Sequence, residues 1–165
     1  DMVRGTHIEF QSMPAQTRPK ISRKFSPQEC ATKQTEVSYL LRKSVIVETH
    51  HDPGEFISPI FVRPKKDGTT LMILNLQSLN EHVVYLHFKM NTLKDAISLM
   101  KPNCFMASID LKDAYYSVPI AQAHQKYLKF QWENKLYAFT CFPNGLAFCP
   151  RKFTKLLKPA YSVLR

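Results

Sequence analysis

Apolar residues recur at helical spacing in some segments and at strand spacing in others, which predicts a mixture of helices and strands. The first helix should begin at residues 26–29, where serine, proline and glutamate have the order of a capping box. The apolar residues that continue it at helical spacing are Val37, Leu40 and Leu41. We expect this helix to reach about Lys43 and a short strand to follow at residues 45–47.

Two antiparallel β-hairpins are predicted further along the chain. Residues 56–64 and 71–76 are rich in strand-forming residues and are joined by an Asp67-Gly68 turn, with two lysines at its tip. The second hairpin should occupy residues 127–142, with its turn at 133–135.

The segment between the hairpins predicts a helix and a strand. Thr92 and Asp95 form a second capping box, and Leu93, Ile97 and Met100 should share one face of the helix that follows. Residues 104–110 alternate between apolar and small or polar side chains, which predicts a strand that ends at Asp110.

The two ends of the chain differ in pattern. Residues 1–25 have few periodic apolar positions, so we expect a poorly ordered tail or linker without a core of its own. After the break at residues 143–145, a final helix should carry an apolar stripe on one face and lysines on the others. The residues of this stripe are Phe153, Leu156, Leu157, Ala160, Tyr161 and Leu164.

Charge favours a polyanionic partner. The chain has 165 residues and 44% hydrophobic residues, and its net charge of +10 favours nucleic acid before a membrane surface. From residue 126 onward the sequence has eight basic residues and a single acidic one, Glu133, so this part should carry a positive face. A basic but unspecialised surface is the alternative. The four cysteines lack metal-ligand spacing, and neither a membrane span nor a secretory signal is present, so we expect an intracellular protein with reduced thiols.

Asp110 is the strongest candidate for chemistry. A carboxylate at a strand end, with Asp113 three residues later, can form a corner for Mg²⁺, which prefers oxygen ligands. An aspartate that caps a helix or forms a turn is the alternative at this stage.

Residues 109–120, Ile-Asp-Leu-Lys-Asp-Ala-Tyr-Tyr-Ser-Val-Pro-Ile, closely resemble the first catalytic motif of reverse transcriptases. Three further blocks agree with that family in order and distance: residues 56–68 resemble its fingers hairpin, residues 74–80 the block after it, and residues 139–146 its template-gripping motif. The sequence of the first motif, together with that of residues 153–159, is most similar to retrotransposons of the DIRS type, which encode a tyrosine recombinase.

This resemblance implies an α+β fold of antiparallel β-hairpins with packed helices, divided into fingers and a partial palm. It gives a tail at residues 1–25, fingers at 26–100, palm with the first motif at 101–120, a returning fingers hairpin at 121–142 and a palm helix at 143–165. The implied partners are an RNA or DNA primer–template and deoxynucleoside triphosphates, with RNase H and recombinase domains in the intact polyprotein.

The resemblance also implies roles for the residues of the first motif. Asp110 would be the catalytic carboxylate that holds two Mg²⁺ ions, or Mn²⁺, with help from the backbone carbonyl of Leu111. The N–H groups of Asp113 and Ala114 would face the triphosphate. Tyr115 would stack beneath the sugar and exclude a 2′-hydroxyl, and plain core packing is the alternative role for this tyrosine.

Other nucleotide contacts are implied outside this motif. Lys65 would fold onto the nucleotide phosphates, although a solvated turn lysine would look the same. Asn144 and Gly145 would contact the nucleotide and template, or would simply form a turn. The last helix would contact nucleic-acid phosphates through four basic residues, which are Arg151, Lys152, Lys155 and Lys158.

The sequence departs from the family pattern in two places. No Asp or Glu follows Glu133, so the downstream Asp-Asp motif that completes the metal site is missing. Residues 70–72 are Thr-Leu-Met where the family usually has an arginine for the triphosphate, and Gln77 replaces a usually basic residue. We therefore expect an RNA-directed DNA polymerase fragment that is inactive as this chain and comes from either a truncated gene prediction or a decayed copy of a retroelement. A non-catalytic nucleic-acid-binding remnant is the alternative.

Overall fold

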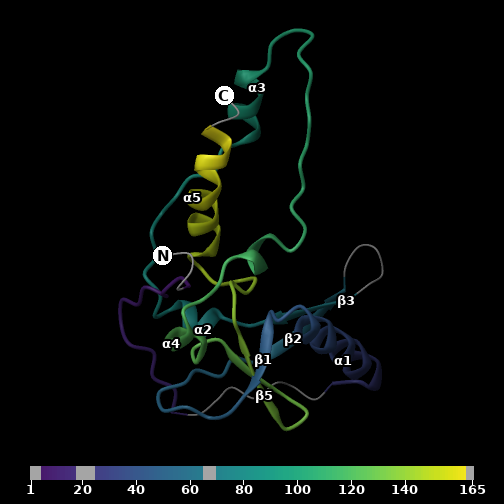
Figure 1. The fold of residues 1–165 in the computed structure, drawn as a ribbon, viewed down its shortest axis with the longest axis vertical. Helices are drawn as coiled ribbons and strands as arrows, with labels where there is room; N and C mark the ends of the chain where they lie inside the picture. The colour runs from purple at the N-terminus through teal and green to yellow at the C-terminus, as the bar shows by residue number, and fades with distance from the viewer. Residues whose placement is uncertain (1–4, 18–24, 65–69, 163–165) are drawn as a thin grey trace.

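The computed structural model describes residues 5–17, 25–64 and 70–162 (Figure 1). The elements in chain order are α1 (Pro27–Arg42), β1 (Ile46–Thr49), β2 (Ile60–Pro64), β3 (Thr70–Leu74), α2 (Gln77–Asn80), α3 (Leu93–Leu99), the 3-10 helix η2 (Ala114–Ser117), α4 (Gln122–Gln125), β4 (Lys129–Trp132), β5 (Lys135–Phe139) and α5 (Cys149–Ser162). All strand pairs in the named sheets are antiparallel, which confirms the predicted α+β class.

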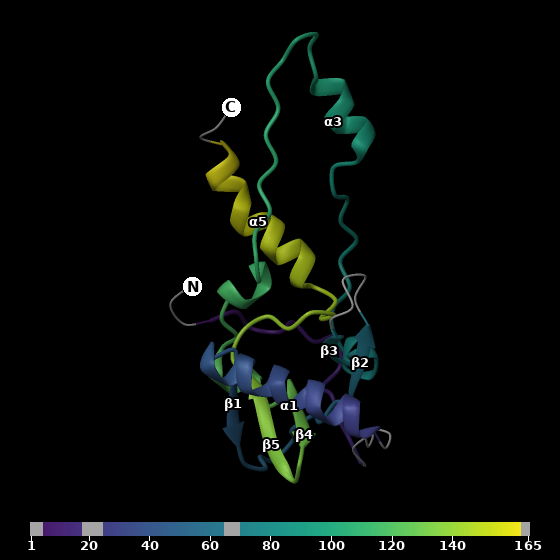
Figure 2. The ribbon, with the colours of Figure 1, turned by 90° about the vertical axis from the view of Figure 1, so that its right-hand side faces the viewer.

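One helix, α1, packs against two small sheets. β1, β5 and β4 form a three-stranded sheet in that order, and β2 and β3 form a separate two-stranded sheet. Helix α1 contacts β1 of the first sheet and β3 of the second, and Figure 2 shows it lying across both. The helix therefore ties the two sheets together.

Local sequence signals explain α1 and the second hairpin. Ser26 accepts a hydrogen bond from the N–H of Glu29 and the Glu29 carboxylate accepts one from the N–H of Ser26, so the predicted capping box is present. Glu133 and Asn134 both have positive φ, at 46° and 60°, as a tight two-residue hairpin turn requires. The predicted positions of the first helix and of both hairpins are confirmed.

A single core lies between these elements. It collects the inward faces of α1, both sheets and the chain after β5, with Leu79, Leu128, Phe130 and Phe142 fully buried. Close packing of these side chains removes apolar surface from water and is the main stabilising contribution to such a fold.

Residues 5–17, which we name the N-terminal segment, differ from the expected tail. Thr6 forms a parallel bridge with Ile120, and Phe10 forms an antiparallel bridge with Val83. Ile8 is buried in the main core. Gly5 has a φ of 79°, and a Cβ atom there would lie 2.6 Å from the Ala121 nitrogen, so glycine permits the close backbone approach. This part of the chain therefore has a place in the core.

Residues 85–111, which we name the arm, leave the core and return to it, as both views show (Figures 1 and 2). The predicted capping box of α3 is present, with Thr92 and Asp95 bonded to each other. The apolar face of this helix is not covered, because Leu93 and Ile97 are exposed. The arm thus has local structure without the packing that we expected.

Candidate functional site

Asp110 lies on the returning limb of the arm. The strand that we predicted at residues 104–110 is absent, and Phe105 and Ile109, expected on its inner face, are exposed. A strand requires a neighbour for its backbone groups, and no described segment pairs with these residues. Asp110 is consequently exposed on irregular backbone, without a hydrogen bond or ion pair to any described residue.

The described residues do not form a complete metal site. They contain no group of three or more histidine, cysteine, aspartate or glutamate side chains that could hold a metal ion. The Asp113 carboxylate accepts a hydrogen bond of 2.8 Å from the Tyr39 hydroxyl, so a neighbouring helix already engages it. Asp110 and the Leu111 carbonyl alone do not provide the ligand set that a pair of divalent ions requires.

The turn after Asp110 has a defined backbone. Asp113 adopts the left-handed conformation, with φ of 54° and ψ of 33°, and Ala114 begins η2 directly after it. The Asp113 carbonyl accepts a hydrogen bond of 2.9 Å from the N–H of Tyr116. A left-handed residue followed by right-handed ones can turn successive N–H groups toward an anion. The conformation is compatible with the predicted phosphate contact.

Two tyrosines connect this turn to the core. The Tyr115 ring packs edge-on against Phe153 of α5, with ring centroids 5.4 Å apart. Tyr116 is more deeply placed, and burial raises the pKa of its phenol far above the usual value. Tyr115 is half-buried and takes part in packing, and its role beside a sugar stays a prediction.

The predicted nucleotide contacts of the first hairpin are only partly visible. Lys65 lies outside the described residues, and so does the rest of the turn between β2 and β3. Met72 occupies part of the stretch where an arginine was expected, and its side chain is buried in the core. This position therefore serves packing in the present chain.

Asn144 and Gly145 are exposed in the loop between β5 and α5. The Asn80 side chain holds this loop, because its amide nitrogen donates to the Gly145 carbonyl at 2.9 Å and its oxygen accepts from the N–H of Ala147 at 2.9 Å. Gly145 has a φ of 96°, which an L side chain rarely adopts. The loop is thus fixed by α2.

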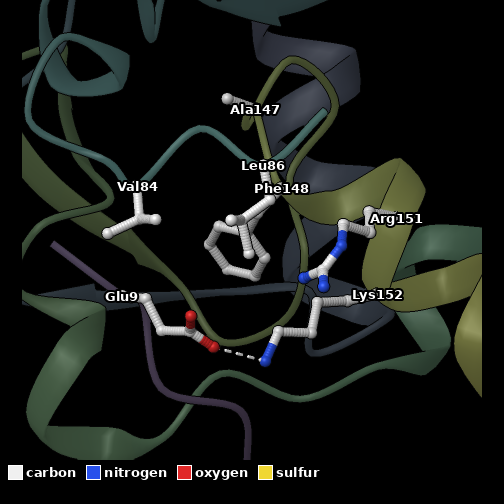
Figure 3. A pocket seen from close by; sticks show the side chains of 7 residues that line it. All are labelled: Glu9, Val84, Leu86, Ala147, Phe148, Arg151 and Lys152. Carbon is white, nitrogen blue, oxygen red and sulfur yellow. Dashed lines mark hydrogen bonds and ion pairs between the residues drawn. The ribbon is translucent and has the colours of Figure 1, made fainter. Parts of the chain in front are cut away.

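The basic residues of α5 meet an acid from the N-terminal segment. The Glu9 carboxylate accepts a hydrogen bond from Lys152 at 2.6 Å, beside a cavity of about 10 Å³ that is also lined by Arg151 (Figure 3). This hydrogen bond lowers the pKa of Glu9, burial opposes it, and the charges of Lys152, Arg151 and Lys155 lower it further. Lys155 and Lys158 are exposed. Of the four basic residues predicted to contact phosphates, Lys152 is therefore already paired with an acid of the chain.

The predicted positive face is smaller than the sequence indicated. Lys129 is buried, and its ammonium donates to Asp52 at 2.7 Å and to Glu55 at 2.8 Å. Lys135 pairs with Glu48 on the sheet at 2.9 Å. These lysines neutralise nearby acids, so among the described residues of this region the unpaired positive charge lies mainly on α5.

Sequence reasoning missed three residues that support the site, which are Glu9, Tyr39 and Asn80. Each acts on a partner at least 65 residues away in the chain. Neither Tyr39 nor Glu9 had a local signal. Tyr39 is half-buried but lies outside the apolar positions that predicted α1, and Glu9 lies in a segment without periodicity. Asn80 belonged to a block with family resemblance, which was the available clue.

Known proteins resemble this chain in sequence and in fold. It is 22% identical over 137 residues to the Pro-Pol polyprotein of Simian foamy virus type 1, a match of 83% of the chain and 12% of the polyprotein. It is 22% identical over 95 residues to the Transposon Tf2-7 polyprotein of Schizosaccharomyces pombe, a match of 58% of the chain and 7% of the polyprotein. The chain thus spans a small part of these relatives. No protein-family model matches it.

The fold of this chain agrees with that of solved structures over most of its length. The foamy viral protease-reverse transcriptase dRH in complex with double-stranded DNA matches with a TM-score of 0.77 at 20% identity, over 93% of this chain and 27% of that one. The foamy viral protease-reverse transcriptase in complex with an RNA/DNA hybrid matches with a TM-score of 0.73 at 20% identity, over 92% of this chain and 21% of that one. The chain therefore has the fold of part of a reverse transcriptase, and its sequence relatives are polyproteins of retroelements.

Proposed function

We propose that this chain is part of an RNA-directed DNA polymerase of retrotransposon origin, which adds deoxynucleotides to a primer on an RNA or DNA template. The observation that carries this proposal is the contact between Tyr115 and Phe153. It brings the turn at Asp113 and Ala114 against the helix that bears Arg151 and Lys152. A turn suited to phosphate thereby lies next to a helix suited to a nucleic-acid backbone.

The proposed roles follow from this arrangement. The N–H groups of Asp113 and Ala114 face the triphosphate, and Tyr115 lies beneath the sugar and disfavours a 2′-hydroxyl. Asn144 and Gly145 contact the nucleotide and template from the loop that Asn80 fixes. Lys65 adds a positive charge to the phosphates.

Asp110 supplies one carboxylate to a metal site that the described residues do not complete. We propose that the 165-residue protein does not extend a primer by itself. The test is primer extension by the purified chain with Mg²⁺ or Mn²⁺, compared with Asp110→Ala. The expected result is equal, background incorporation by both proteins, and extension above the Asp110→Ala control would overturn the proposed inactivity.

A second candidate function is nucleic-acid binding without catalysis. It is favoured by the combination of a basic α5 with the absence of a metal-ligand cluster among the described residues. Three or four phosphate contacts predict that affinity for a primer–template falls roughly 40- to 150-fold between about 50 and 200 mM salt. Fluorescence anisotropy with a labelled duplex measures this change, and affinity independent of salt would contradict it.

We also propose that this chain is part of a larger polyprotein. The intact polyprotein would add RNase H and recombinase domains, and the division into fingers and palm would follow the ranges given above. The finer similarity to DIRS-type elements stays a prediction. Among the described residues, no helix has both the length and the apolar character for crossing a membrane.

A further inference from the structure

A hydrogen bond joins α1 to the turn that follows Asp110. The Tyr39 hydroxyl donates to the Asp113 carboxylate at 2.8 Å, across 74 residues of sequence. A hydrogen bond to an ionised acceptor is stronger than one between neutral groups, so this contact can hold a turn in place.

Tyr39 is mounted on a rigid support. Val37 and Leu40, on either side of it in α1, are buried in the core, and the capping box fixes the start of the helix. The Lys43 ammonium lies 5.6 Å from the Tyr39 ring centroid and adds a cation–π contact. The phenol is therefore presented from a fixed position.

Asp113 needs such support because of its backbone. It is a non-glycine residue at a φ of 54°, a conformation that L residues adopt at some cost and keep where surrounding contacts impose it. The arm that leads into it has no strand partner among the described residues. The bond from Tyr39 is a side-chain contact that anchors Asp113 itself, in addition to the packing of Tyr115 on Phe153.

We propose that Tyr39 is a positioning residue of the nucleotide site, because its hydroxyl holds the Asp113 carboxylate and so fixes the turn that carries the N–H groups of Asp113 and Ala114. This inference rests on the proposed function of that turn. Tyr39 does not touch the nucleotide; it acts through Asp113.

A double-mutant cycle tests the inference in the 165-residue protein. The variants are Tyr39→Phe, Asp113→Gly and both together, with inorganic tripolyphosphate in metal-free buffer as the probe and calorimetry as the measurement. Glycine keeps the left-handed backbone accessible while removing the acceptor. The matched control is Tyr85→Phe, which removes the hydroxyl of an exposed tyrosine of the arm.

The expected result is that Tyr39→Phe weakens binding about tenfold in the natural background and has no further effect beside Asp113→Gly. Tyr85→Phe should bind like the natural chain. Equal weakening by Tyr39→Phe in both backgrounds would show that its effect bypasses Asp113 and would overturn the inference. If the natural chain binds and Tyr39→Phe binds equally well, only the positioning role falls; if the natural chain does not bind, the proposed nucleotide role of the turn falls with it.

A spectroscopic titration of the tyrosines tests directly whether the hydrogen bond between Tyr39 and Asp113 forms. The hydrogen bond to Asp113 raises the pKa of the Tyr39 phenol, with smaller contributions from burial and from the charges of Asp113 and Glu36, while Arg42 opposes them. The phenolate absorbance lost in Tyr39→Phe should therefore appear at higher pH in the natural chain than in Asp113→Gly. An unchanged titration would show that the bond is absent and would overturn the inference.

Discussion

Individual charged residues decide how much of the formal charge of this chain is available to a partner. Lys129 and Lys135 are paired with acids on the sheet side, and Lys152 is paired with Glu9. Glu9 is notable because it reaches α5 from the other end of the chain, across 143 residues. An acid in this position competes with any phosphate for the same ammonium group.

We predict that Glu9→Gln strengthens binding of a primer–template about three- to tenfold at low salt, because it releases Lys152 and removes a negative charge from the basic helix. The measurement is fluorescence anisotropy at several salt concentrations. Glu133→Gln is the control, since it makes the same charge change on the exposed turn of the β4–β5 hairpin. Equal gains from both variants would indicate a general charge effect and contradict the local one.

The ion pairs also predict a loss of stability in acid. Hydrogen bonding to Lys129 lowers the pKa of Asp52; burial raises the pKa of Glu55, but hydrogen bonds from His51 and Lys129 outweigh it. Carboxyl groups with a lowered folded pKa stabilise the fold above their unfolded pKa. We therefore expect the melting temperature to fall as the pH drops below about 4.5 and these groups are protonated.

Calorimetric melting between about pH 7 and pH 3 measures this loss. In Lys129→Met the main cation of the cluster is gone. The variant should be less stable at neutral pH and should lose less on acidification. A steeper acid loss in the variant than in the natural chain would contradict this assignment.

The separate elements show what sequence can predict. Helix α1 and both hairpins were predictable, because their capping residues, turn residues and apolar spacing lie within a few positions of one another. The N-terminal segment was not, since its place depends on Val83 and Ile120, which are distant in sequence. Residues 104–110 have the alternation of a strand but no partner for it in the described structure, and a periodic pattern does not supply one.

The same difference applies to the candidate site. Asp110 and the residues from Asp113 to Tyr115 were found from one contiguous motif, and the loop at Asn144 from another. The pairing of Tyr39 with Asp113, and of Glu9 with Lys152, joins segments that only the tertiary fold brings together. Local sequence gave no reason to connect them.

Docking of the N-terminal segment gives an element-scale prediction. Gly5→Ala should lower the free energy of unfolding by about 1–3 kcal/mol, because a methyl group would strain the backbone and meet the Ala121 nitrogen at 2.6 Å. Gly54→Ala is the matched control, since Gly54 also has a positive φ, 68°, but its nearest neighbour is the Lys126 ammonium at 3.7 Å. Urea denaturation compares them, and equal losses would show that the close approach at Gly5 is not formed.

At the scale of the whole molecule, a well-packed core is joined to an arm that leaves apolar groups in water. The exposed large apolar residues of the arm are Tyr85, Leu86, Met90, Leu93, Ile97, Leu99, Met100, Phe105, Met106, Ile109 and Leu111. Exposed apolar side chains in this number favour association with other apolar surface. The core and the arm therefore make opposite contributions to the behaviour of the 165-residue protein in solution.

We predict that this protein self-associates as its concentration rises and that the joint change of Phe105, Met106 and Ile109 to serine reduces the association severalfold. Light scattering coupled to size exclusion measures it. A control that changes the exposed Leu41, Val47 and Phe61 to serine removes a similar apolar content from the core side. If only the control substitutions reduce self-association, the surface through which the molecules associate lies outside the arm.

The bridge between Thr6 and Ile120 has a consequence for the order of folding during synthesis. Residues 5–17 leave the ribosome before the rest of the core, and the His124 ring that accepts a hydrogen bond from the N–H of Ile8 is made 116 residues later. At typical translation rates this delay is on the order of ten seconds, far longer than hairpin formation takes. The N-terminal segment is thus synthesised before its partners in the core and docks after them, and during that interval Ile8 is available to chaperones.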